Sequence, residues 1–333
     1  KLEKVRNELQ IIQKPFNTTT RILALNFTST HIYTQCEQTF RELDPDIHVL
    51  VNNVGMGYQD GIPVRFGETP NLDQFCTDMI NVNIMSCTRL TALVLPAMVF
   101  NGQGVIINVS SFAANLPIPL LSQYSATKAY MDYFSRGLAV EYNDRGIIVQ
   151  SVMPNVVSTK MVAQPIRNSS FIPSARDYVR HTIRTVGFAS RTAGYPSHRI
   201  AQIFYDFVAF ISDIIGVNLG QKLTKLCERL GQILMYLIAI RLIIMVWRFI
   251  KNYNKSDVLV GNGCKWAVIT GATDGIGLAY AHELALRQYN LLLISRSQEK
   301  LEKELDSERA YGSRQYDSQP QPYGSRVSRS LEV

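Results

Sequence analysis

A tyrosine and a lysine four residues apart, Tyr124 and Lys128, are the side chains of this sequence best suited to proton transfer. In a helix, residues i and i+4 lie on one face, so the phenol and the ammonium can share one site. A nearby positive charge favours phenolate and lowers a tyrosine pKa from its reference of about 10 towards the range of a working proton donor. Such pairs also occur on solvated helix faces, so the pair alone does not establish a site.

A glycine-rich turn near the other end of the chain is suited to binding phosphate. An apolar strand, KWAVIT, runs into Gly271-Ala272-Thr273-Asp274-Gly275-Ile276-Gly277, which opens a helix ahead of a second apolar strand, LLLISR. Glycines let the backbone approach a pyrophosphate, and the helix N-terminus supplies N–H groups and a positive dipole. A glycine triplet alone is weak evidence, but this strand–turn–helix–strand setting predicts a dinucleotide site.

The residue that ends the second of these strands bears on which dinucleotide is bound. Arg296 stands where an acidic side chain would bind a ribose 2′-hydroxyl. An arginine at that position favours a 2′-phosphate, so we expect NADP(H) as the cofactor. The alternative is a solvated arginine at a strand end.

The elements that must position these residues alternate between apolar strands and helices. Further strands are expected at 21–27, 47–55, 104–110 and 147–154, and helices at 1–13, 31–43, after Asn71, around Tyr124 and near 175–186. This alternation predicts an α/β fold with a doubly wound, Rossmann-like parallel sheet. Polar residues that follow a buried strand, as in NNVG at 52–55, are expected at the sheet edge where ligands bind.

The composition narrows the class of partner. The chain has 333 residues, 46% of them hydrophobic, and a net charge of +7 with a pI near 9.1, which suits nucleotide phosphates, acyl-CoA or a lipid surface. There is no CxxC spacing to suggest a metal site and no basic-aromatic run to suggest nucleic acid. The five scattered cysteines favour a reducing compartment.

A hydrophobic segment separates the two groups of functional residues. Residues 231–250, GQILMYLIAIRLIIMVWRFI, are long enough to span a bilayer, although Arg241 in the middle costs about 2.5–3.5 kcal/mol. A membrane span, an interfacial helix and a buried helix of a soluble enzyme are the alternatives. We therefore expect four parts: a catalytic part (1–200), a membrane-associated segment (201–255), a cofactor-binding β-α-β part (256–303) and a disordered tail (304–333).

Together these residues resemble the short-chain dehydrogenase/reductase family. TGATDGIG is similar to the family's cofactor turn and NNVG to its post-strand motif. The resemblance implies a catalytic tetrad of Asn83, Ser111, Tyr124 and Lys128, with Ser111 preferred to Ser110 because of its distance from the tyrosine. It also implies that Asn53 and Thr159 meet the cofactor beside the glycine turn. Asn155, after Pro154, departs from the glycine that many members have.

Several segments resemble one branch of that family more narrowly. VNNVGM, MINVNI, VQSVMP and RTVGFASRTAGY are similar to the membrane-bound branch of 17β-hydroxysteroid dehydrogenases and very-long-chain 3-oxoacyl-CoA reductases. This implies an NADPH-dependent ketone reductase of the endoplasmic reticulum membrane, with its catalytic part facing the cytosol. The implied substrate is a lipid, either a 3-oxoacyl-CoA or a 17-ketosteroid, and the enzyme is a possible homodimer.

The order of the two parts is the reverse of the family's order, in which the cofactor turn precedes the tyrosine. KLEK occurs at 1–4 and again at 300–303, and overlaying the copies gives a continuous ISRSQEKLEKVRNELQ. The chain is then either a circular permutation or a join of neighbouring gene copies, and the unrelated tail after the second KLEK favours the join. Both parts must lie on one side of a membrane, so residues 203–250 must cross it an even number of times or not at all. The alternative function is a catalytically inactive, membrane-associated remnant or interaction protein.

Overall fold

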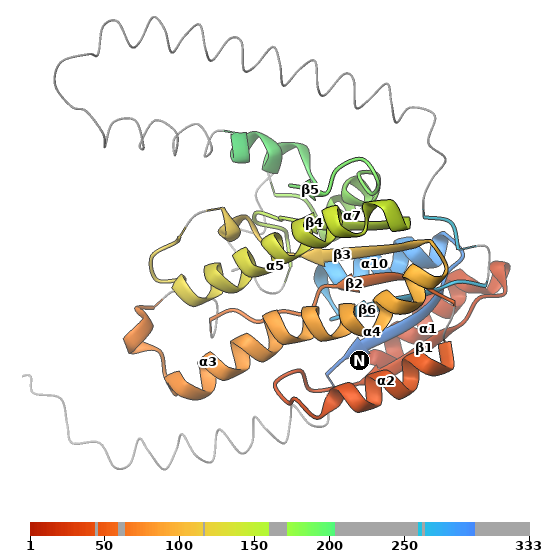
Figure 1. Cartoon of the computed structure of the whole chain (residues 1–333), viewed down its shortest axis with the longest axis horizontal. Helices are drawn as coiled ribbons and strands as arrows, with labels where there is room; N and C mark the ends of the chain where they lie inside the picture. The colour runs from red at the N-terminus through yellow and green to blue at the C-terminus, as the bar shows by residue number, and fades with distance from the viewer. Residues whose placement is uncertain are drawn as a thin grey trace, which may run out of the picture.

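A seven-stranded parallel sheet lies at the centre of the computed structural model (Figure 1). The structure describes residues 1–43, 46–58, 64–115, 117–159, 172–203, 259–261 and 264–296. The strands are β1 (Thr20–Ala24), β2 (Ile47–Asn52), β3 (Gly104–Val109), β4 (Ile147–Val152), β5 (Arg191–Thr192), β6 (Trp266–Thr270) and β7 (Asn290–Ser295). Their order across the sheet is β1-β7-β6-β2-β3-β4-β5. The predicted doubly wound parallel sheet is thus confirmed.

The two strands that come last in the sequence lie inside the sheet. β6 pairs with β2, with Leu50 opposite Val268, and β7 pairs with β1, with Ile22 opposite Leu293. β7 is buried throughout and β6 nearly so, because both of their faces are covered by helices, as is usual in parallel sheets. Segments more than two hundred residues apart in the sequence therefore form neighbouring strands of one sheet.

Helices cover both faces of the sheet (Figure 1). On one face, α1 (Leu2–Gln13), α7 (Ala175–Ile183) and α10 (Gly275–Leu286) pack on alternate strand residues such as Val51 and Ile269. On the other face, α2 (Ile32–Leu43), α4 (Ser86–Phe100) and α5 (Ser122–Glu141) pack on the intervening residues, such as Leu50 and Val268. This alternation follows from the two-residue period of a strand.

The long helical region after Asn71 is not uniform. It comprises α3 (Leu72–Ile80), a π-helical turn η4 (Asn81–Met85) and α4. Among the described residues, Leu72–Phe100 is the stretch that is long and apolar enough to cross a membrane, by length and composition alone. Since α4 packs against β2 and β3, we interpret it as a core helix. Short 3₁₀ turns, η1 (Lys14–Phe16), η3 (Phe66–Glu68), η5 (Phe112–Ala114) and η6 (Asn143–Arg145), complete the fold.

Several expectations from the sequence lie outside the described residues. These are the hydrophobic segment 231–250, the second KLEK at 300–303 and the tail 304–333. The four-part division of the chain and the number of membrane crossings stay predictions.

Candidate active site

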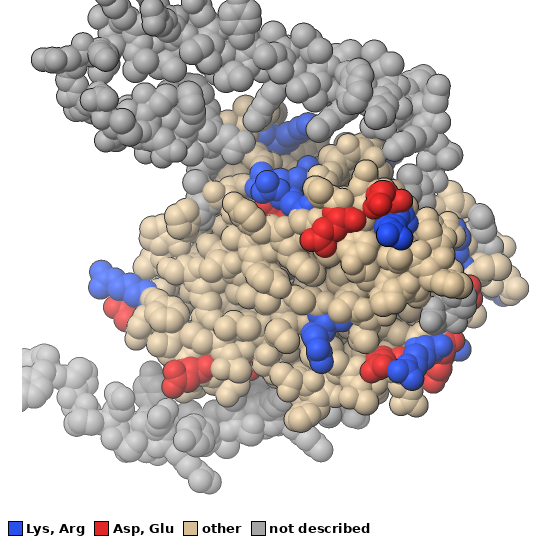
Figure 2. All heavy atoms as spheres, in the orientation of Figure 1, with Lys and Arg blue, Asp and Glu red and all other residues tan. Residues whose placement is uncertain are grey.

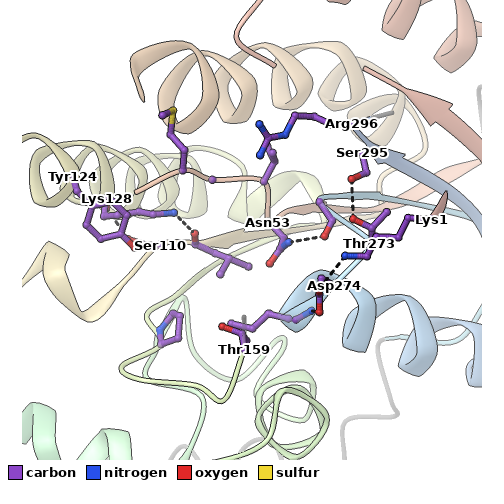
Figure 3. Close-up of a pocket in the computed structure, with 18 residues that line it drawn as sticks. Lys1, Asn53, Ser110, Tyr124, Lys128, Thr159, Thr273, Asp274, Ser295 and Arg296 are labelled. Atoms are coloured by element: carbon purple, nitrogen blue, oxygen red, sulfur yellow. Dashed lines mark hydrogen bonds and ion pairs between the residues drawn. The ribbon is translucent and has the colours of Figure 1, made fainter. Parts of the chain in front are cut away.

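A cavity of about 430 Å³ lies at the carboxyl edge of the sheet. Its walls come from the β6–α10 turn, the residues after β2 and β7, the end of β3, the first turns of α5 and the loop after β4 (Figure 3). Tyr124 and Lys128 therefore share one cavity with the glycine turn, although the two groups are far apart in the sequence. The carboxyl edge is where open α/β sheets bind their ligands.

The glycine turn leaves no room for side chains on its inner side. Gly271 and Gly275 have φ values of +64° and +53°, which favour glycine. A Cβ placed on Gly277 would lie 2.3 Å from the carbonyl oxygen of Gly271. Asp274 caps α10 by accepting a hydrogen bond from the Gly275 N–H at 2.8 Å. Ile276 also lines the cavity, so the N-terminus of α10, the kind of helix end that binds anions, faces this space.

Asn53 holds the turn from the neighbouring strand. Its side-chain amide donates to the carbonyl oxygens of Thr270 at 3.1 Å and Gly271 at 3.3 Å, and its own N–H donates to Thr270 Oγ1 at 2.9 Å. Asn53 lines the cavity, but its amide hydrogens are directed at the backbone of the turn. Asn53 therefore has a structural role that the sequence did not indicate, and its contact with the cofactor stays a prediction.

The end of the cavity away from Tyr124 carries two cationic residues. Arg296, which follows β7, and Lys1, at the start of α1, both line it (Figure 3). Lys1 Nζ lies 3.0 Å from Asp274 Oδ2, and Thr273 shares a hydrogen bond of 3.1 Å with Ser295. The part played by Lys1 was not predicted, because only the sheet brings α1 beside the glycine turn. Thr159, predicted to meet the cofactor, lines the cavity opposite Gly275.

Tyr124 lies in the first turn of α5, and its side chain points into the cavity (Figure 3). Burial raises the pKa of the Tyr124 phenol above its usual 10.0, and a hydrogen bond with Ser111 lowers it again in part. Ser111 is the N-cap of η5. The neighbouring Ser110 donates its hydroxyl to the Lys128 carbonyl oxygen at 2.7 Å. Ser110 lines the cavity and Ser111 is not among its lining residues, but Ser111 is the serine that contacts the Tyr124 phenol. The choice of Ser111 for the tetrad stays a prediction.

Lys128 is 4% exposed and lies beneath the tyrosine ring, with Nζ 5.9 Å from the ring centroid. The ammonium donates to the Val109 carbonyl oxygen at 3.0 Å. Burial lowers its pKa from 10.5 to about 8. The sequence predicted that Lys128 would lower the pKa of Tyr124. In the structure burial dominates and raises that pKa, while the opposing effect comes from Ser111.

Asn83 lies in the π-helical turn and is fully buried. Its Nδ2 donates to the Met56 carbonyl oxygen and to Thr127 Oγ1, each at 3.0 Å, and its Oδ1 accepts from the Met56 N–H at 2.8 Å. Asn83 thus links the loop after β2 to α5, one residue before Lys128. It lies behind the cavity wall, near Gly55, rather than in the lining.

Comparison with known proteins identifies the fold's relatives. The family model for short chain dehydrogenase matches residues 1–169 and 265–319. The chain belongs to this family. A very-long-chain 3-oxoacyl-CoA reductase of Mus musculus is 44% identical over 202 residues, which are 60% of this chain and 62% of that protein. The chain therefore spans less than two thirds of that relative's length.

A second relative agrees with the assignment of this chain to the family, and a solved structure shares its fold. The very-long-chain 3-oxoacyl-CoA reductase-A of Danio rerio is 38% identical over 225 residues, which are 67% of this chain and 68% of that protein. A solved structure of a ketone-specific alcohol dehydrogenase from Comamonas testosteroni has a TM-score of 0.50 at 22% identity, covering 67% of this chain and 84% of its own. That likeness supports the fold.

Proposed function

We propose that this short chain dehydrogenase binds NADP(H) and reduces the ketone of a 3-oxoacyl-CoA, with Tyr124 as the proton donor. The observation that carries the proposal is the shared cavity. Tyr124 and Lys128 line the same space as Gly271 and Gly275, so a dinucleotide anchored at the turn extends towards the tyrosine.

The cavity fits the proposed cofactor. A Cβ on Gly271 or Gly277 would collide with Asn53, so glycines allow the tight turn that would present the N-terminus of α10 to a pyrophosphate. Arg296 supplies positive charge after the end of β7, where a ribose 2′-phosphate would be bound, while the charge of Lys1 is paired with Asp274. When bound, the nicotinamide supplies the hydride. Asn53 and Thr159 form the side walls of this space.

The protein's own residues supply the proton and the electrostatic stabilisation. We assign Tyr124 as the general acid that protonates the carbonyl oxygen. Ser111 donates a hydrogen bond where negative charge develops. Lys128, whose ammonium lies 5.9 Å from the tyrosine ring centroid, is assigned to bind the ribose of the cofactor. Asn83 positions Met56 and α5, and in this proposal also holds the water that returns a proton to the site.

The substrate class is inferred from the relatives and from charge. The relatives are named very-long-chain 3-oxoacyl-CoA reductases, and a net charge of +7 suits the polyanionic CoA. A 17-ketosteroid is the alternative lipid substrate. We further propose an endoplasmic reticulum membrane location with the site facing the cytosol. The basis is the names of the relatives and the hydrophobic segment 231–250.

A homodimer is proposed on the surface of α4 and α5. Figure 2 shows few charged side chains over the face that these helices present. Tyr133 and Val140 of α5 are 71% and 81% exposed, and Phe100 at the end of α4 is 88% exposed. Exposed apolar side chains gathered on one face are typical of an interaction surface.

Replacing Tyr124 by Phe tests the proposed activity. NADPH oxidation by the purified chain with a 3-oxoacyl-CoA should fall by about 10²–10⁴-fold, while the dissociation constant for NADPH should stay near the wild-type value. Tyr142→Phe, at the C-terminal end of the same helix, is the matched control and should retain turnover. Undiminished turnover in Tyr124→Phe would refute the assignment. A wild-type chain that binds no NADPH would support the alternative of an inactive remnant or interaction protein.

A further inference from the structure

A buried histidine bridges two backbone groups of the loop that follows β4. His198 is 4% exposed. Its Nδ1 lies 3.3 Å from the N–H nitrogen of Asn155, and its Nε2 lies 3.1 Å from the carbonyl oxygen of Val156. One imidazole thus contacts the donor of one residue and the acceptor of the next.

The two contacts require one particular protonation state. Nδ1 must accept the Asn155 N–H and Nε2–H must donate to the Val156 oxygen, which is the neutral Nε2–H tautomer. An imidazolium carries a hydrogen on both nitrogens, so its Nδ1–H would be directed at the Asn155 N–H. Burial lowers the pKa of His198 below its usual 6.5, although its backbone contacts with Val156 and Ala193 oppose this.

Among the described residues, the backbone contacts with Val156 and Ala193 favour an imidazolium, but burial of the ring is the larger effect. The ring centroids of Tyr178, from α7, and Tyr195 lie 5.5 Å and 5.9 Å from that of His198. The Tyr178 hydroxyl donates to the Ala193 carbonyl oxygen at 3.0 Å. Arg199, the next residue, is exposed, and the loop residues Asn155 and Val156 carry no charge. These neighbours include phenols and backbone groups but no carboxylate.

The loop held by His198 forms one wall of the cofactor cavity. Pro154 and Thr159, at its two ends, both line the cavity. The Pro154 carbonyl oxygen accepts from the Phe112 N–H at 2.8 Å, and the Ser158 N–H donates to Pro173 at 3.0 Å. Between these two fixed points, His198 holds the segment through the backbone of Asn155 and Val156. Moving that segment would move Thr159 relative to Gly275, on which a Cβ would lie 3.1 Å from the Thr159 methyl carbon.

We propose that neutral His198 is a positioning residue that holds the 154–159 loop in its cofactor-binding shape, and that protonation of His198 weakens cofactor binding. The inference rests on the proposed function only in taking NADP(H) as the occupant of the cavity.

Two variants separate the effect of the His198 hydrogen bonds from the effect of its titration. The amide of His198→Gln places an oxygen and an NH₂ at a spacing similar to that of the ring nitrogens, but it does not titrate. His198→Phe removes both contacts.

The decisive measurement is the dissociation constant of NADP⁺, which withstands acid, between about pH 8 and about pH 5.5. His198→Phe should bind about tenfold more weakly than wild type at high pH, since a buried backbone group loses its partner. His198→Gln should bind close to wild type at high pH and lose less affinity on acidification. The 2′-phosphate of NADP⁺ also titrates in this range, so the contribution of His198 is the difference between the two profiles. His31→Gln, at an exposed histidine, is the control and should keep the wild-type profile.

Hydrogen exchange of the cofactor-free chain gives a second readout. Amides of residues 155–159 should exchange faster in His198→Phe than in wild type or His198→Gln. Equal pH profiles for His198→Gln and wild type would overturn the titration, and unchanged affinity and exchange in His198→Phe would overturn the positioning role. If His198→Phe exchanges faster than wild type but the wild-type chain binds no NADP⁺ at any pH, the positioning role stands and the proposed function is refuted.

Discussion

Arg191 Nε lies 3.1 Å from each carboxylate oxygen of Asp132, whose side chain is 2% exposed. Asp132 lies in α5 one turn after Lys128, and Arg191 is the first residue of the short strand β5. Arg191 Nη2 also donates to Asn115 Oδ1 at 2.6 Å, and Asn115 ends the turn that begins at Ser111. The guanidinium therefore links the helix of Tyr124 to the turn of Ser111.

Replacing Arg191 by Leu should destabilise the fold. The variant leaves the buried Asp132 carboxylate with Ser151 and the more distant Arg136 as its partners, and removing one partner of a buried pair costs about 3 kcal/mol or more. We expect urea denaturation to give a free energy of unfolding lower by about that amount. Arg145→Leu, which breaks the exposed pair with Asp144, should cost less than about 1 kcal/mol. Equal effects in the two variants would contradict this account of the buried pair.

Replacing Ser111 by Ala should reduce turnover and shift its pH dependence. Loss of a hydrogen-bond donor at the developing charge costs about 10²–10³ in kcat. Because the hydrogen bond with Ser111 lowers the pKa of Tyr124, the variant should have a higher tyrosine pKa. In the direction of alcohol oxidation the phenolate is the base, so the rise of kcat with pH should move to higher pH. Ser122→Ala, at an exposed serine of α5, is the control and should leave the pH profile unchanged. An unchanged pH profile in Ser111→Ala would show that Ser111 has no part in the site.

Replacing Gly277 by Ala should abolish NADPH binding. The added Cβ would lie 2.3 Å from the Gly271 carbonyl oxygen and 2.5 Å from Asn53 Nδ2, so the turn must move and lose its fit to a pyrophosphate. Gly137→Ala is the matched control: Gly137 lies in α5, where a Cβ would meet no atom within 4 Å. That control should bind NADPH normally and gain about 0.5–1 kcal/mol of stability, since alanine is the better helix former. Isothermal titration measures the binding, and normal affinity in Gly277→Ala would place the dinucleotide elsewhere.

The sequence predicted those parts of the fold that depend on local pattern. The apolar runs now seen in β2 and β6 are parallel, buried strands, and the glycine turn lies where such strands end. Contacts made only by assembly of the sheet were not predicted. Asp132 with Arg191 and Asn155 with His198 join residues some forty to sixty positions apart, and no periodicity connects them. The π-helical turn at Asn81–Met85 lies between α3 and α4 without a break in the helical region, so the sequence predicted one long helical region there.

The prediction for Lys128 failed for a related reason. A spacing of four residues places two side chains on one helix face, but it does not give their depth. The amine of Lys128 reaches back to the Val109 carbonyl oxygen, and the burial of Tyr124 outweighs the effect of charge on the phenol. The depth to which these side chains are buried depends on how the helix packs on the sheet, and that packing is determined by residues from the whole chain.

Replacing Lys128 by Met should stabilise the fold at neutral pH while impairing turnover. Burial lowers the pKa of Lys128 from 10.5 to about 8, which corresponds to roughly 3 kcal/mol of destabilisation below pH 8. The variant removes that cost but leaves the Val109 carbonyl oxygen without its ammonium donor, at about 1 kcal/mol. A net gain of about 2 kcal/mol in the free energy of unfolding is therefore expected near pH 7.

The pH dependence of that gain distinguishes burial from a packing effect. Between the folded and unfolded pKa values of Lys128 the unfolded chain binds more protons, so wild-type stability rises with pH from about 8 towards 10.5 relative to the variant. The advantage of Lys128→Met should shrink over this range and reverse near its upper end. Urea denaturation of both proteins at pH values from about 7 to about 10 measures the difference. A difference that stays constant with pH would show that the buried amine carries no titration cost, and that its pKa lies near the usual value for lysine.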